Sequence, residues 1–202
     1  MSSATISFLP PGPPPEPIKR ISVEQYHAII RAGVFDDDDP IELLEGWLVE
    51  KMPKKPPHSV ATGLVSDALA PLLPAGWHLI SQEPITTADS EPEPDIGIIR
   101  GKRRDYLDGH PSPKDVGLVV EVADSTLARD RGVKKIIYAR ASIPIYWIIN
   151  LVERNVEVYS DPTGPNKKPD YRQMQIFGPK DSTPLLLDGK EIGRLKVKLI
   201  LP

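Results

Sequence analysis

Hydrophobic and polar positions follow a helical period in parts of the chain. Residues 59–73 carry apolar side chains three or four positions apart, and Pro74 and Gly76 would end a helix there. Ser22 and Gln25 have the spacing of a capping box, in which each side chain bonds the other residue's backbone at the start of a helix. The pattern predicts helices at about residues 22–32, 59–73 and 127–141.

Short apolar runs bounded by turn residues predict strands. Residues 95–99 and 117–122 are largely apolar, which is typical of buried strands. Residues 41–51 divide at Glu45-Gly46 into the two arms of a hairpin, because glycine supplies the geometry of a tight turn. Further strands are expected at residues 77–82, 84–87, 143–150, 155–160, 171–177 and 194–200. This order of elements predicts an α/β chain of the α+β type, with a mixed sheet, flanking helices and extra β-hairpins.

The composition is that of a globular protein. The 202 residues are 40% hydrophobic and 26% charged, so a core of useful size is possible. Residues 10–17 are mostly proline, which favours an extended polyproline conformation. We expect an N-terminal arm over residues 1–19 and a single domain over residues 20–202. Docking of the arm into an aromatic groove of a partner is an alternative role.

Cysteine content and charge exclude several kinds of chemistry. The chain has no cysteine, which excludes disulfides, thiolate zinc sites and cysteine nucleophiles. The longest apolar run, Ile143–Ile149, is far shorter than the roughly 20 residues of a membrane span, and the start of the chain does not resemble a signal peptide. We therefore expect a cytoplasmic protein without a membrane partner. A net charge of −3 gives no overall attraction to nucleic acid, so such contacts would depend on local basic groups.

Two acidic residues interrupt the apolar strands. Asp95 opens one strand, and Glu121 lies between Val120 and Val122 in the other. A buried carboxylate needs a partner, and Mg²⁺ is bound by one or two carboxylates with water completing its shell. Lys134 lies on the next helix, where an ammonium could orient water or neutralise a phosphate. Two carboxylates, a metal and a lysine suffice for phosphodiester hydrolysis. Solvated strand ends and a surface lysine are the alternative explanation.

The order and spacing of several motifs resemble the Uma2 family, also called DUF820. The matching segments are Glu42–Gly46, His58, Pro94-Asp95, Glu121-Val122, Arg129–Lys134, Tyr138-Ala139 and Ile143–Ile149. Members of this family are described as restriction endonucleases of the PD-(D/E)xK superfamily. The resemblance implies a restriction-endonuclease-like core in which Asp95 and Glu121 bind Mg²⁺ or Mn²⁺.

The chain departs from the general superfamily pattern at the lysine. That pattern has a lysine two residues after the second acid, where this chain has Ala123. The Uma2-like pattern places the lysine on the following helix, and Lys134 matches it better than Lys135 because it stands two residues after Gly132. Neighbouring helical residues point about 100° apart, so only one of the two lysines can face a metal.

Further residues are accessory candidates or departures from the family. By the resemblance, Glu42 lies near the site, and Lys135 is the second candidate lysine. His58 could carry a proton, lie beside the metal, or only cap or pack its helix. Asn150 stands where family members commonly have Asp, and we expect this change to affect a turn and not catalysis.

These observations lead to one preferred function and two alternatives. We expect a metal-dependent DNA endonuclease with Asp95, Glu121 and Lys134 as its catalytic residues. A homodimer is expected, because two sites most simply cut both strands of a duplex. The alternatives are a nuclease-fold module that binds nucleic acid without cutting it, and a structural or regulatory partner protein.

Overall fold

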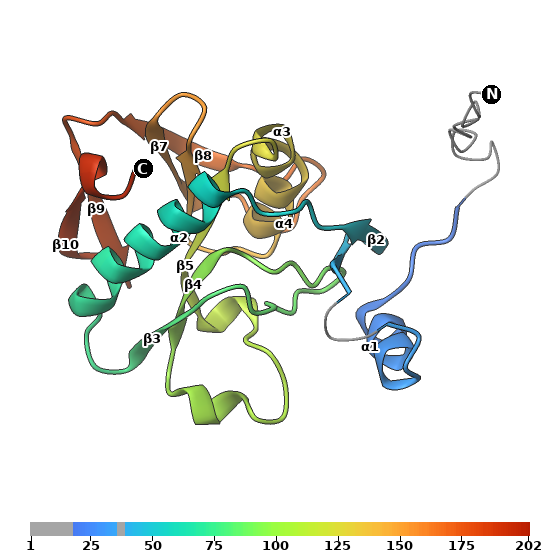
Figure 1. Ribbon diagram of the computed structural model, residues 1–202. Coiled ribbons are helices and arrows are strands. Elements are labelled where there is room, and N and C mark those ends of the chain that lie inside the picture. Colours follow the sequence, from blue (N-terminus) through green and yellow to red (C-terminus); the bar gives the residue numbers. More distant parts are fainter. Residues whose placement is uncertain (1–17, 36–38) are drawn as a thin grey trace, which may run out of the picture.

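The centre of the fold is a six-stranded mixed sheet, seen in a computed structural model that describes residues 18–35 and 39–202 (Figure 1). Its strand order is β3-β4-β5-β6-β7-β8, and every neighbouring pair is antiparallel except β5 and β6, which are parallel. The strands are β3 (Trp77–Ile80), β4 (Ile96–Arg100), β5 (Val116–Ala123), β6 (Ile145–Asn150), β7 (Asn155–Pro162) and β8 (Tyr171–Phe177). The mixed sheet predicted from the sequence is thus confirmed.

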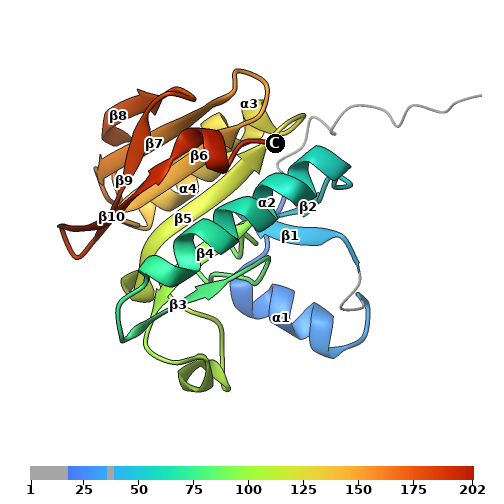
Figure 2. The same cartoon turned by 60° about the vertical axis from the view of Figure 1, so that its left-hand side comes forward.

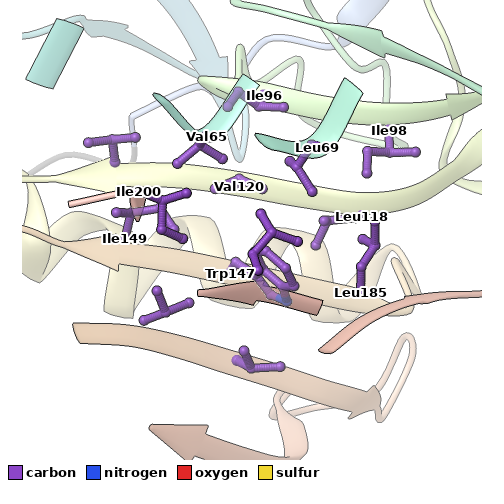
Figure 3. Packing of buried hydrophobic residues seen from close by; sticks show 14 of the residues in the cluster. Val65, Leu69, Ile96, Ile98, Leu118, Val120, Trp147, Ile149, Leu185 and Ile200 are labelled. Atoms are coloured by element: carbon purple, nitrogen blue, oxygen red, sulfur yellow. The ribbon is translucent and has the colours of Figure 1, made fainter. Parts of the chain in front are cut away.

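Helices pack on both faces of this sheet. Val65 and Leu69 of α2 (Pro56–Leu69) lie over the buried side chains of β4, β5 and β6 (Figure 3). Ile137 and Tyr138 of α4 (Lys135–Arg140) belong to a second apolar cluster on the other face. The other α-helices are α1 (Val23–Arg31), which has the predicted capping box at Ser22, and α3 (Leu127–Arg129). No described helix is long and apolar enough to cross a membrane.

Alternation along β5 determines the direction of its acidic residue. Val120 and Val122 belong to the cluster under α2, whereas Val119 and Ala123 belong to the cluster under α4. Successive side chains of a strand point to opposite faces, so Glu121 lies on the α4 side. Side chains that contact Glu121 must therefore come from the α4 side of the sheet.

Two hairpins form separate two-stranded sheets beside the central one, and the first of them was predicted from the sequence. β1 (Ile41–Leu44) and β2 (Trp47–Glu50) meet at Glu45 and Gly46, whose φ angles of 50° and 78° are both left-handed, as a tight hairpin turn requires. A Cβ atom on Gly46 would lie 2.6 Å from Cβ of Arg20, so only glycine fits there. The second hairpin, β9 (Ser182–Leu187) with β10 (Lys190–Lys196), packs against the cluster under α2.

Several expectations were wrong in detail. Residues 84–87 form no strand, because their backbone amides bond to loop carbonyls, such as that from Ile85 to Pro92. Strand β9 was not predicted, and β10 begins earlier than the expected strand at 194–200. The expected helix at 127–141 is broken by a wide turn over Asp130–Lys134, in which Gly132 leaves helical geometry. The proline-rich run at residues 10–17 lies outside the described residues.

Candidate active site

Strand register brings the two predicted metal ligands together. Ile96 of β4 pairs with Val120 of the antiparallel β5, and Gly97 pairs with Val119. Asp95 directly precedes β4, and one further step of the same register would place it opposite Glu121. Directly opposite residues have Cβ atoms about 4.5–5.5 Å apart. The charge of Asp95 contributes to the raised pKa of Glu121, so the two carboxyl groups lie near each other at one end of β4 and β5.

Hydrogen bonds hold the Asp95 carboxylate in its charged form. Its Oδ2 accepts the backbone N–H of Val122 at 2.8 Å and lies 3.1 Å from Nε2 of His58, while Oδ1 accepts from Gln82 at 3.4 Å. Burial by itself would raise the pKa of Asp95, but the contacts with His58 and Val122 outweigh it and hold the pKa below its usual value. His58 thus contacts Asp95, the proposed metal ligand, which agrees with a position beside the metal.

Glu121 is more deeply buried than Asp95. Only 4% of the residue is exposed, and its Oε1 accepts both the Lys134 ammonium at 2.9 Å and the Tyr138 hydroxyl at 2.7 Å. Burial raises the pKa of Glu121 to about 8, against the opposing effect of Lys134. Asp130 and Asp95 add to this rise because like charges disfavour ionisation. Glu121 is thus a carboxyl group whose charge requires a further cation.

The two candidate lysines have different surroundings. Lys134 is 3% exposed, and its Nζ lies between Glu121 and Oε2 of Glu42, the latter at 3.2 Å. Burial opposes its charge, but these carboxylates raise the pKa of Lys134 well above its usual value. Lys135 instead pairs with Asp170 at 2.9 Å. Lys134 therefore contacts the buried carboxyl groups of Glu121 and Glu42, whereas Lys135 lies away from them.

Glu42 joins the cluster from the β1–β2 hairpin. Its Oε2 also accepts the backbone N–H of Glu93 at 3.2 Å, and the residue is 1% exposed. Its Oε1 is buried without a hydrogen-bond partner, and the nearby guanidinium of Arg129 is 3.8 Å away. His58 has a similar unsatisfied atom, since its Nδ1 is buried and accepts or donates no hydrogen bond. Such orphaned polar atoms are costly unless a ligand satisfies them.

A small polar cavity of about 60 Å³ opens onto this cluster. It is lined by Glu42, Lys51, Met52, Pro53, Lys54, Lys55, His58, Glu93, Asp95, Val122, Asp124, Ser125, Thr126, Arg129 and Lys134. A buried water needs roughly 10–15 Å³ of such volume, so the cavity has room for a hydrated ion. The cavity is therefore a site for the reacting groups, beside which the rest of a large substrate would lie.

The donor set fits a hard divalent cation. The buried acids here are Glu42, Asp95, Glu121 and Asp130, and Lys134 is the buried ammonium among them. Within residues 18–35 and 39–202, no three acidic or histidine side chains form a ready-made metal cage. Mg²⁺ does not require one, because it keeps several waters and takes one or two carboxylates. Residues Asp95 and Glu121 thus suit Mg²⁺ or Mn²⁺ better than a metal that needs a full set of protein ligands.

Some residues of the cluster could not be recognised from the sequence. Asp130, which the sequence did not single out as a site residue, is 2% exposed and accepts the Thr126 hydroxyl at 2.6 Å. Tyr138 matched the family only as part of a motif, and its hydrogen bond to Glu121 was not predicted. The signal that could have found it is the spacing of four residues between Lys134 and Tyr138, which places them on one helix face.

Asn150 serves both a turn and the core. Its Oδ1 accepts the backbone N–H groups of Val152 and Glu153 at 3.1 and 2.9 Å, as its expected place in a turn requires. Its Nδ2 donates to the fully buried Glu157 at 2.8 Å. That second bond connects Asn150 to a network with Arg131 and lies outside the candidate active site.

Comparisons with known proteins identify the fold and the family of the chain. A crystal structure of "a putative nuclease belonging to DUF820" from Anabaena variabilis ATCC 29413 is similar, with a TM-score of 0.67 at 16% sequence identity. The similarity covers 89% of this chain and 97% of that chain, and it shows that the two share a fold. No curated protein matches the sequence. The model of the Uma2 family, described as "putative restriction endonuclease", matches residues 23–192, and the chain therefore belongs to the Uma2 family.

Proposed function

We propose that this chain is a metal-dependent endonuclease that hydrolyses DNA phosphodiester bonds, with Mg²⁺ or Mn²⁺ held by Asp95 and Glu121. The observation that carries the proposal is that two buried carboxyl groups, those of Asp95 and Glu121, lie near a buried, charged Lys134. When bound, such an ion lowers the pKa of a water ligand and polarises the phosphate. A purely structural cluster would not need this excess of buried acid.

The role of Lys134 follows from its charge. The neighbouring carboxylates keep its ammonium protonated, so it serves as a hydrogen-bond donor and positive charge and not as a proton acceptor. A fixed ammonium orients the attacking water and offsets the negative charge that develops on the phosphate. Lys134 lies at the end of the wide turn before α4. Ala123 stands where the superfamily pattern has its lysine, and it is buried in the cluster under α4.

Asp95 and Glu121 hold the ion in different ways. Asp95 is ionised before a metal arrives and is oriented by His58 and the backbone of Val122. Glu121 gives up its raised pKa when a cation replaces its proton, so its charge develops together with metal binding. This pairing gives a site that is oriented in advance but binds a divalent ion only on deprotonation.

The experiment is incubation of plasmid DNA with wild-type protein, Asp95→Asn and Glu121→Gln, in EDTA and then with added Mg²⁺ or Mn²⁺. Asp188→Asn, which changes an exposed acid near β9, is the matched control. We expect metal-dependent cleavage by wild type and the control, and none by the two site variants. A gel shift in EDTA distinguishes the alternatives: binding without cutting indicates a nucleic-acid-binding module, and neither binding nor cutting indicates a partner protein. Sedimentation with duplex DNA tests the proposed homodimer.

A further inference from the structure

Basic side chains border the proposed catalytic cavity on one side. Lys54 and Lys55 lie in the loop between β2 and α2, and Arg129 is the last residue of α3. The start of α2, which follows the two lysines, and α3, which carries Arg129, lie near each other (Figures 1 and 2). Lys51, from the same loop, is neutralised by Glu93 at 2.7 Å. Three cations thus remain at the mouth of the cavity.

Arg129 is poorly satisfied by the protein itself. Its Nε is buried without a hydrogen-bond partner. Its Nη1 makes one long bond of 3.4 Å to the carbonyl of Glu50, and the carboxylate of Glu42 is 3.8 Å away. A guanidinium has five N–H donors in a fork that matches phosphate or carboxylate. The orphaned donor therefore indicates an anionic ligand on the cavity side of Arg129.

The two lysines are available to the same ligand. Lys54 is exposed and forms no ion pair within the described part of the chain. Lys55 pairs with Asp124 at 3.2 Å, but its side chain is 60% exposed and that of Asp124 is 35% exposed. Pairs of this kind are weak because solvent screens them, so a phosphate can displace Asp124. Even when the negative charge of Asp124 is included, the three cations leave a net positive charge.

We propose that Arg129, Lys54 and Lys55 bind a backbone phosphate of the nucleic acid next to the one that is cleaved. This inference rests on the proposed function, because the cavity beside them is where the reacting phosphate would lie. A backbone phosphate fits better than an isolated small anion, because the three cations border a cavity that the proposed catalytic residues Asp95 and Lys134 also line. The three residues would hold the substrate in register with Asp95 and Glu121.

The chain contains a matched control for this surface. Lys54-Lys55-Pro56 and Lys167-Lys168-Pro169 are the same tripeptide, and all four lysines are exposed. Only the first pair lines the catalytic cavity. A double substitution of each pair therefore removes the same charge from two different places.

The test measures the affinity for a fluorescent duplex oligonucleotide in EDTA from 50 to 300 mM salt. Each lost phosphate contact lowers the slope of log K against log salt by about 0.9, which is roughly eightfold in affinity per tenfold change in salt. Lys54→Ala/Lys55→Ala and Arg129→Gln should each lower the slope, by at most about 0.9, because the three side chains share one phosphate. Arg129→Lys should restore the slope because it retains the charge, and Lys167→Ala/Lys168→Ala should match wild type. Thermal melting of each variant checks the fold.

The outcomes separate this inference from the proposed function. Equal loss of slope in both double variants, or unchanged slopes in Arg129→Gln and Lys54→Ala/Lys55→Ala, would overturn the phosphate site even if wild type cleaves DNA. Loss of slope in these variants alone would support the site even if wild type cleaves nothing with Mg²⁺ or Mn²⁺, in which case the proposed catalysis fails. A wild type that shows no salt-dependent binding overturns the site.

Discussion

Replacing Lys134 by methionine tests the proposed site most directly. Methionine keeps much of the side-chain volume but removes the charge that lies 2.9 Å from Glu121 and 3.2 Å from Glu42. We expect loss of metal-dependent cleavage. The matched variant Lys135→Met alters the adjacent residue of the helix and should retain cleavage, with at most weaker and salt-dependent DNA binding.

The two substitutions should differ in stability as well. Removal of one partner of a buried ion pair leaves an uncompensated charge and costs about 3–5 kcal/mol. Lys134 is 3% exposed and faces two buried carboxyl groups, so this range applies to Lys134→Met. The partner of Lys135, Asp170, has a side chain that is 55% exposed, and such pairs contribute about 0–1 kcal/mol. The stability of Lys134→Met must therefore be measured alongside its cleavage activity.

A second substitution separates stability from catalysis. Glu121 already has a raised pKa of about 8, so without Lys134 it takes up a proton, whereas Glu42 remains beside the vacated position. Glu121→Gln in the Lys134→Met background should therefore recover part of the lost stability and none of the activity. Urea unfolding followed by tryptophan fluorescence, beside plasmid cleavage in Mn²⁺, gives both quantities. Full activity in Lys134→Met with an inactive Lys135→Met would refute the assignment, and so would equal stability of the two variants.

Other predictions concern the surroundings of this ion pair. Below pH 8 a cation must displace the proton of Glu121, so the Mn²⁺ dissociation constant should rise about tenfold per pH unit as the pH falls, which calorimetry in buffers of different ionisation enthalpy will show as proton release. Tyr138→Phe removes the 2.7 Å bond to Glu121 and should lower Mn²⁺ affinity or cleavage about 10–100-fold, whereas Tyr171→Phe, whose hydroxyl bonds a backbone carbonyl, should leave both unchanged. Asn150→Asp keeps the turn acceptor but sets a carboxylate against buried Glu157, and it should cost about 1–3 kcal/mol in urea unfolding without loss of catalysis.

Features that depend on neighbouring residues in the sequence could be predicted. The capping box at Ser22 and the turn at Glu45-Gly46 are set by local backbone geometry, and both occur as expected. The buried strands around Asp95 and Glu121 follow from uninterrupted apolar runs. Because each acid broke such a run, the sequence indicated that both would be buried at the sheet.

Features that depend on long-range packing could not be predicted. Strand β9 contains Pro184, which disfavours a central strand, and it is tolerated because β9 pairs only with β10. The sequence around Gly132 is compatible with a regular helix, so the wide turn there could not be predicted without the tertiary structure. Arg129 and Lys54 are 75 positions apart in the chain, and no local pattern joins them.

The cost of the acidic cluster is itself an argument for function. Glu42, Asp95, Glu121 and Asp130 are each less than a tenth exposed, and one lysine compensates them only in part. Apolar residues of similar volume would give equal or greater stability at such positions. Without the ammonium of Lys134, the buried carboxyl groups would lose their compensating charge. Without these carboxyl groups, burial of the ammonium would itself be unfavourable. A site that loses stability in this way is expected where a cation completes it, and the backbone bond from Val122 to Asp95 shows that the sheet holds the carboxylate in place before any cation binds.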